Sequence, residues 1–371
     1  MTESSYHLRT LSDSDIPSWA NFCAQCFAYK ANPPPASYFE RHFYNDPRKD
    51  SSLIRVIDHH GNDESAETTT TIVSSTRVFQ KTISLGNGKT IEAGGIGEVC
   101  TSEGHRKKGL AKRLLLNAID VMENERKMQC SLLHASSALT AVYERSAQYF
   151  CVNSKWNAIT VKTDELSVVV QDSTTSSNFH VRLVSFPKDT TQLQRIHTQY
   201  SEQRFAGCIV RSETYWNEYI QHEIGSSLYV VTSSVEGEDF ILGWLSIRPR
   251  GGRFQLREFG VDLEKCRSME LTTSKIMSIL LNVALSHEDT CDMDAIELHL
   301  PTVIVEEMKS QTDFDEKGCP WIDWKVAIKV DNDIGWMYKM FDSNCDGEES
   351  NMIHIVNNLK VPHLIWPADS F

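Results

Sequence analysis

The chain has 371 residues, 40% of them hydrophobic, and a formal net charge of -13 at pH 7. This length is too great for one small core and favours two domains. An acidic chain repels phosphate groups over long range, so the charge argues against nucleic acid or anionic lipid as non-specific partners. It favours a cationic partner, such as an amine.

The sequence also indicates a compartment. Residues 1–5 have neither the basic region nor the apolar run of a secretory signal, and the longest apolar helix candidate, residues 276–285, is too short to span a bilayer. Of the ten cysteines, only Cys23 and Cys26 are close in sequence, and no second pair completes a zinc site, so we predict core packing for both. We expect a cytoplasmic protein with no metal and no membrane partner.

The first half of the chain is predicted to form one α/β unit, from its hydrophobic periodicity, caps and turns. Its elements, in order, are a strand at 8–11, a helix from a Ser12 or Asp13 cap to 27, a helix at 36–42, a strand at 53–57, a loop at 59–67, a strand at 69–79, a hairpin at 81–93 around Asn87-Gly88, a central strand ending at 101, a helix at 110–124, a strand at 129–135, a helix from a Ser136-Ser137 cap to 147, and strands at 149–152 and 156–161.

The central strand leads into a basic turn and a helix start, a combination that suits a pyrophosphate. Backbone N–H groups in such a turn, and the N-terminus of a helix, both attract anions. Gly109 permits close approach of the backbone to a ligand, and Arg106, Lys107 and Lys108 add positive charge. One apolar face of the helix follows from the spacing of Leu110, Leu114, Ala118, Ile119 and Met122. The alternative is a solvated basic helix start in an ordinary α/β core.

After a polar linker at 172–178, the pattern of elements restarts and predicts a second copy of the same unit. Its elements are a strand at 181–184, helices at 192–203 and 212–222, a hairpin at 227–249, a central strand at 254–262, a helix at 272–285 and a strand at 295–300. Between 261 and 272 there is no basic glycine turn, and Asp262, Glu264 and Glu270 would repel a pyrophosphate. We therefore expect the second copy to shape a substrate pocket without binding a cofactor.

The run Arg106-x-x-Gly109-x-Ala111 resembles the acetyl-CoA signature, Gln/Arg-x-x-Gly-x-Gly/Ala, of the GCN5-related N-acetyltransferases (GNAT). The two-copy layout, the length, this motif and the ending at 366–371 resemble the fungal lysine N6-acetyltransferases of lysine catabolism. The chain is similar, more distantly, to the bacterial enhanced-intracellular-survival acetyltransferases. Those proteins carry a third, sterol-carrier-like domain, whereas we expect only a short tail here after the second copy.

This resemblance implies an α/β (α+β) fold of tandem GNAT units, each a mixed twisted sheet flanked by helices. Residues 1–168 would form the catalytic domain that binds acetyl-CoA. Residues 179–371 would form a GNAT-like domain without a cofactor motif, whose C-terminal tail returns to the active site. The backbone of the central strand would pair with the pantetheine arm and the turn would hold the pyrophosphate, which implies a cofactor site of Val99, Cys100, Thr101, Arg106, Lys107, Lys108, Gly109, Leu110, Ala111 and Lys112.

Acyl transfer to an amine needs a base, a donor for the oxyanion and a proton for the departing thiolate. Tyr143 occupies the place of the tyrosine in the family's Tyr-x-x-x-Gly-Phe motif, so the resemblance implies that it is the general acid. The family's glycine is absent here, where Ala147 and Gln148 stand. The alternative is that Tyr143 only packs its helix on the sheet.

Two groups compete for the role of base. Glu98 lies on the central strand, where many relatives keep a catalytic glutamate, but alternation along a strand could point it away from the acyl chain. In the bacterial tandem relatives a C-terminal Phe carboxylate enters the active site, and this chain also ends in Phe371. Residues 361–367 are apolar and resemble an inserted strand, and an ordinary packed tail is the alternative. A buried carboxylate has a raised pKa and is a better base.

Two further residues are substrate candidates. His134, near the end of the strand after the cofactor helix, is a core histidine or a substrate contact, and Glu258 contacts a cationic substrate or has a structural role. The resemblance to the fungal family implies that the chain acetylates a primary amine of a small molecule, with the N6 amine of free L-lysine favoured. The alternatives are a protein or peptide N-acyltransferase and a GNAT-fold binding protein with little activity. The oligomeric state is not predictable from these patterns.

Overall fold

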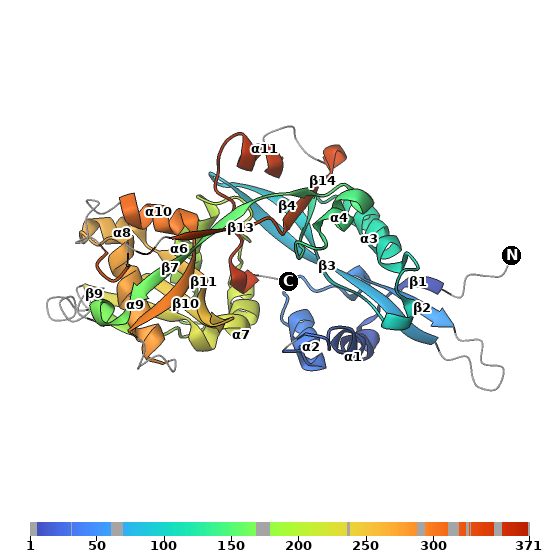
Figure 1. The fold of residues 1–371 in the computed structure, drawn as a ribbon, viewed down its shortest axis with the longest axis horizontal. Helices are drawn as coiled ribbons and strands as arrows, with labels where there is room; N and C mark the ends of the chain where they lie inside the picture. The colour runs from blue at the N-terminus through green and yellow to red at the C-terminus, as the bar shows by residue number, and fades with distance from the viewer. Residues whose placement is uncertain are drawn as a thin grey trace.

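The computed structural model describes residues 6–30, 32–60, 70–167, 179–235, 238–287, 294–310, 319–323, 326, 328–344 and 351–369. These residues form two lobes, each built on a seven-stranded mixed sheet with helices packed against it (Figure 1). The predicted α/β class and the predicted second copy of the fold are therefore confirmed. The predicted linker at 172–178 lies outside the described residues, as does most of the predicted loop at 59–67.

The first sheet confirms the predicted order of elements through the helix after the central strand. Its strands, in spatial order, are β1 (Tyr6–Thr10), β2 (Ile54–His60), β3 (Thr70–Gly86), β4 (Lys89–Thr101), β5 (Cys130–His134), β14 (Trp336–Met340) and β6 (Phe150–Cys151). Its helices are α1 (Ile16–Cys26), α2 (Ala36–Tyr44), α3 (Leu110–Asp120) and α4 (Thr140–Ala147). The predicted hairpin at 81–93 is the far end of the two long strands β3 and β4, and α4 begins at Thr140 rather than directly after Ser137.

The second sheet repeats this plan. Its strands, in spatial order, are β13 (Lys329–Asp333), β7 (Ser154–Lys162), β12 (Ala295–Pro301), β11 (Arg253–Val261), β10 (Glu238–Arg250), β9 (Tyr229–Val235) and β8 (Phe179–Leu183). The helices of this lobe are α6 (Thr190–His197), α7 (Gln221–Ile224), α8 (Leu263–Ser268), α9 (Thr273–Ser286) and α10 (Thr302–Ser310). Helix α11 (Met352–Asn357) contacts β14 of the first lobe. In each sheet one parallel pair stands at the centre, β4 with β5 and β11 with β12.

The apolar faces predicted from the sequence are those that the sheets cover. On α3, the residues predicted to form one face are all buried: Leu110, Leu114, Ala118, Ile119 and, in the π-helical turn that follows, Met122. On α9, most of the helix is buried, as expected for an element covered on several sides. No helix in the described ranges is long and apolar enough to cross a bilayer.

The two sheets exchange strands. β7, predicted as residues 156–161 to finish the first unit, instead lies between β13 and β12 of the second sheet. In return, β14 lies between β5 and β6 of the first sheet. His363 joins the two exchanged strands, because its Nδ1 lies 2.6 Å from Ser154 Oγ and its Nε2 lies 2.8 Å from Tyr338 Oη. Burial lowers the pKa of His363 to about 3, so the ring is neutral at physiological pH.

The tail at 361–367 is not the strand that its apolar sequence predicts. It forms a single bridge, in which the Ala206 N–H donates to the Pro362 carbonyl and the Leu364 N–H donates to the Ala206 carbonyl, each over 2.9 Å. Gly207 makes this contact possible, since its φ is +94° and an added Cβ would lie 2.7 Å from His363 Nε2. The tail is thus held mainly by side-chain contacts and by one short stretch of backbone bonds.

Candidate functional site

The two central strands of the first sheet separate. β4 pairs with β5 only from Ala93 to Gly95, although its other edge stays paired with β3 as far as Thr101. A bulge in the β3–β4 register accompanies the separation, and Glu98 adopts a left-handed φ of +54° at this point. The edge of β4 that faces β5 beyond Gly95 is therefore free of strand pairing and can receive an extended chain.

A cavity of about 810 Å³ opens at the end of β4. It is lined by the end of α1, the end of β4, the turn that follows and the residue before α4: Phe22, Gln25, Cys26, Phe27, Tyr29, Val99, Cys100, Thr101, Ser102, Glu103, Arg106, Ala111 and Leu139. Five of the predicted cofactor residues thus line one hollow. Cys23 was predicted correctly as a core residue, whereas Cys26 is half-buried and lines this cavity.

The basic turn leads directly into α3. Gly109 is the residue before the helix and has a φ of +77°, a conformation that favours glycine. The Arg113 N–H donates to the Gly109 carbonyl over 3.0 Å, so the N–H groups ahead of it point out of the helix N-terminus. The side chains of Arg106, Lys107 and Lys108 are exposed. Together these groups suit a bound anion and make the mouth of the cavity a candidate anion site.

The turn is braced from within. Arg106 Nε donates to the Thr101 carbonyl over 3.1 Å, and Lys108 Nζ donates to Tyr6 Oη over 2.7 Å. These contacts fix the backbone of the turn while leaving much of the basic charge open to solvent.

Tyr143 lies on α4 and packs against the same hydrophobic cluster as Val99. Its ring meets that of Tyr149 edge-on, with the centroids 6.1 Å apart. Burial raises the pKa of Tyr143, so its hydroxyl stays protonated at neutral pH. Within the described ranges, no hydrogen-bond partner holds that hydroxyl. A protonated, uncommitted phenol is a suitable proton donor.

Glu98 lies on the other side of the separated strands. Val99 packs on the face of the sheet that α3 and α4 cover, and Cys100 packs on the opposite face, under α1 and α2. Glu98 faces the α1 and α2 side, beside His42 and Arg77. Its Oε1 is 3.6 Å from Arg77 Nη1, and neither carboxylate oxygen has a hydrogen-bond partner among the residues described. Burial raises the pKa of Glu98, although Arg77 and His42 oppose the shift. A buried, unsatisfied carboxylate of this kind is a candidate base.

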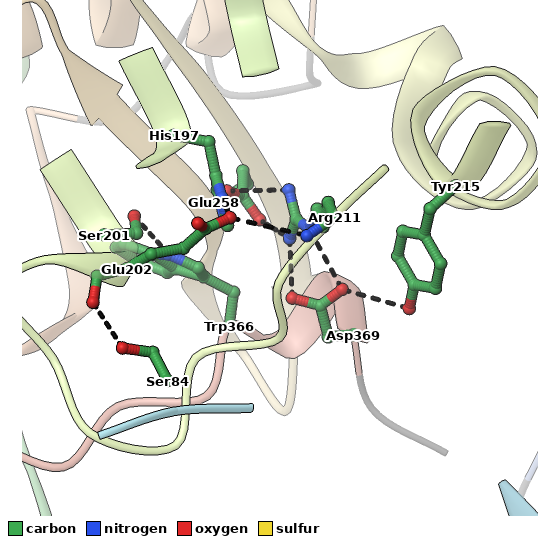
Figure 2. Close-up of polar contacts among 9 residues, drawn as sticks. All are labelled: Ser84, His197, Ser201, Glu202, Arg211, Tyr215, Glu258, Trp366 and Asp369. Carbon is green, nitrogen blue, oxygen red and sulfur yellow. Dashed lines mark hydrogen bonds and ion pairs between the residues drawn. The ribbon is translucent and has the colours of Figure 1, made fainter. Parts of the chain in front are cut away.

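Glu258, predicted as a possible contact for a cationic substrate, is committed elsewhere. It is completely buried, and its two oxygens accept from Arg211 over 3.2 and 2.7 Å (Figure 2). The same guanidinium donates to Asp369 in the tail over 3.1 and 2.6 Å, and Tyr215 donates to Asp369 over 3.2 Å. Glu258 therefore has a structural role here: it helps to anchor the tail on the second lobe.

His134 is not a core histidine. Its side chain is 44% exposed, and its Nε2 lies 2.9 Å from Asp333. It lines a second cavity, of about 480 Å³, where the two lobes meet. Phe371 lies outside the described residues; the tail is described as far as Asp369, which is buried. Within the described ranges, no group of three or more metal-binding side chains forms a metal site.

Sequence reasoning missed a polar cluster between the lobes. His42 Nε2 on α2 lies 3.1 Å from Glu223 on α7, and Arg257 of β11 lies 3.6 Å from the same carboxylate. Tyr38 joins this cluster from α2; burial, Glu223 and Glu98 raise its pKa to about 12. The sequence signal was weak, because each residue is a single polar side chain on an otherwise ordinary helix or strand.

Residues 7–146 match the family described as the acetyltransferase (GNAT) domain. No curated protein matches the sequence. Similar solved structures share the fold of the two lobes. A GCN5-related N-acetyltransferase from Kribbella flavida is 14% identical with a TM-score of 0.57, and the match covers 91% of this chain and 71% of that one.

Two further structures extend this comparison. Eis1 from Mycobacterium abscessus is 10% identical with a TM-score of 0.52, covering 91% of this chain and 74% of that one. N-myristoyltransferase from Saccharomyces cerevisiae, with bound myristoyl-CoA, is 10% identical with a TM-score of 0.51, covering 91% of this chain and 83% of that one. The two-lobed arrangement is therefore shared with several acyltransferases.

Proposed function

We propose that the protein, an N-acetyltransferase whose GNAT domain spans residues 7–146, transfers an acetyl group from acetyl-CoA to a primary amine of a small molecule, with the N6 amine of free L-lysine as the favoured acceptor. The observation that carries the proposal is the unpaired edge of β4 that leads into the anion site at the start of α3. An extended pantetheine arm suits the first, and a pyrophosphate suits the second.

The coenzyme would occupy the cavity at the end of β4. The backbone of Val99 and Thr101, with Cys100 between them, would pair with the amides of the pantetheine arm. The N–H groups from Lys107 to Lys112 would hold the pyrophosphate, and the exposed basic side chains would add charge. The apolar wall formed by Phe22 and Phe27 would cover the arm.

The reaction would then use the two sides of the separated strands. Glu98 takes a proton from the ammonium or the attacking amine, whose ordinary pKa is about 10.4 for lysine. The amine nitrogen attacks the thioester carbonyl carbon, the carbon–sulfur bond breaks, and the Tyr143 phenol gives its proton to the departing thiolate. The raised pKa of each group supports its role, since Glu98 becomes a stronger base and Tyr143 stays protonated.

Release of free CoA thiol measures this activity directly. With acetyl-CoA as donor, we expect turnover with L-lysine to exceed that with polyamines, aminoglycosides and a basic peptide. The Tyr143→Phe variant should release thiol about 100-fold more slowly with every acceptor, because the leaving thiolate loses its proton donor. Preference for the peptide would make the protein a peptide acyltransferase. If no acceptor led to thiol release, the proposed catalytic roles of Glu98 and Tyr143 would be wrong.

Protection of Cys26 from alkylation tests the coenzyme site without turnover. The half-buried Cys26 lines the predicted pantetheine cavity, whereas the half-buried Cys151 lies on β6 and serves as an internal control. Saturating acetyl-CoA should slow modification of Cys26 by N-ethylmaleimide about tenfold and leave Cys151 unchanged, as peptide mass spectrometry can measure. The hydrogen bond with Cys100, and then burial, raise the pKa of Cys26, so the labelling is best run at alkaline pH. Equal protection of both thiols, or of neither, would contradict the site.

A further inference from the structure

The cavity between the lobes has an arginine-rich wall. The β10–β11 hairpin contributes Arg248, Arg250, Arg253 and Gln255 to a hollow of about 480 Å³. The remaining walls come from both sheets and the tail: His134, Trp156, His299, Asp331, Asn332, Asp333, Trp336, Ile365 and Pro367. Its size suits a small molecule rather than a folded partner.

Two of these guanidinium groups are oriented without being neutralised. Arg248 donates to Gln255 Oε1 from Nε over 3.1 Å and from Nη2 over 2.9 Å, and Arg250 donates to the same oxygen over 3.0 Å. Neither guanidinium has a carboxylate within 4.0 Å in the part of the chain that the structure describes. By contrast, Arg253 lies 3.4 Å from Glu297 and 3.6 Å from Asp331. A neutral amide oxygen thus fixes two positive charges side by side.

The positive charges on this wall repel one another. Burial, and then the nearby Arg257 and Arg250, lower the pKa of Arg248 to about 10. A bound anion would relieve that repulsion and fill the remaining donor positions.

The anion is not a phosphate, because the same cavity carries negative charge. Asp331 and Asp333 of β13 lie on its wall, and they would repel a dianion but attract an ammonium group. Asp331 lies 2.9 Å from His299, whose pKa is lowered by burial and by Arg253. Arg253 Nη1 lies 3.6 Å from the same carboxylate. The cavity therefore offers adjacent sites for a carboxylate and for an ammonium group.

We propose that this cavity binds the amino-acid head group of the acceptor, with Arg248 and Arg250 holding its carboxylate. The ammonium group then faces Asp331 and Asp333. This inference rests on the proposed function, since it assigns the class of acceptor: a molecule with an α-amino-acid group at one end and a second amine at the other. Tyr38 lies between this cavity and the proposed catalytic base, because it interacts electrostatically with both Arg248 and Glu98.

Acceptors that differ only in the carboxylate test this assignment. L-lysine is compared with 1,5-diaminopentane, and L-ornithine with 1,4-diaminobutane. For the unmodified protein we expect kcat/KM to be about 10- to 100-fold higher for each amino acid than for its diamine, because the diamine lacks the carboxylate that accepts a charge-assisted hydrogen bond. Arg248→Gln and Arg250→Gln should reduce this preference through a higher KM for the amino acid, with little change for the diamine. Arg267→Gln, at an exposed position on α8, is the matched control and should leave the preference intact.

Binding distinguishes this inference from the proposed function. Calorimetry in the presence of CoA should give a tighter complex with L-lysine than with 1,5-diaminopentane, and Arg248→Gln should remove the difference while the melting temperature stays unchanged. Equal affinity for the two ligands, or an equal loss for both in the variant, would overturn the carboxylate site. Selective binding of L-lysine without any acetylation would instead overturn the proposed function and leave the site standing.

Discussion

Replacing Arg211 with methionine should lower the free energy of unfolding by about 3–5 kcal/mol. Arg211 is completely buried between two carboxylates that are also completely buried, Glu258 on β11 and Asp369 in the tail. Burial disfavours the charge on Arg211, but the two carboxylates outweigh that effect and raise its pKa. Without the guanidinium, two carboxylates remain in the interior with no cation beside them, and Tyr215 can satisfy only one oxygen of Asp369.

Urea unfolding measures this loss, and two variants control it. Arg253→Met removes ion pairs with Glu297 and Asp331, whose side chains are 39% and 50% exposed, so it should cost less than about 1 kcal/mol. Arg211→Met combined with Glu258→Gln and Asp369→Asn should recover much of the stability, because no charge is then left buried and unpaired. A single-variant loss as small as that of Arg253→Met would mean that the buried network does not hold the tail.

Glu98→Gln should reduce kcat by about 100-fold or more while acetyl-CoA affinity is retained. The amide cannot take the proton from the amine, but it keeps the size of the side chain at the bulge of β4. In the unmodified protein, kcat should rise as pH increases through the raised pKa of Glu98, because only the carboxylate is a base. That rise should be absent in the variant. Initial rates across pH, with calorimetry for acetyl-CoA, provide both measurements.

The same substitution should increase stability at neutral pH. The pKa of Glu98 is higher in the folded than in the unfolded protein, so its contribution to stability is fully present below the unfolded pKa, about 4.3, and is lost as pH rises through the folded value. The gain of the variant should therefore disappear in acid. Glu92→Gln, on the same strand with its side chain 45% exposed, is the control and should change neither quantity. Unchanged kcat in Glu98→Gln would show that Glu98 is not the base.

Local signals predicted the fold of the first lobe well. The apolar strand, the basic turn and the periodic face from Leu110 onward are encoded within one short stretch of sequence, and their structure depends on bonds between near neighbours. The wrong assignment of residues 156–161 has a different origin. β7 has the composition of any central strand, and nothing in its own sequence says which of two similar sheets it completes.

The roles of the buried charged residues could not be predicted from local sequence either. Glu258 could be recognised as an unusual residue within a buried strand, but its partners, Arg211 and Asp369, lie far from it in the sequence. The arginine wall was missed for a related reason: the charges on β10 matter only because Gln255 orients them and the tail closes the cavity. Such sites depend on long-range packing, which periodicity does not report.

The exchange of β7 and β14 has a consequence for translation. Strand β6 emerges from the ribosome early, yet its partner in the sheet, β14, is synthesised only after most of the second lobe. The edge of β5 that pairs with β14 therefore stays unpaired until β14 has been synthesised. A truncated product that ends before β14 would expose this edge to other nascent chains, so premature termination should yield aggregates rather than a half-enzyme.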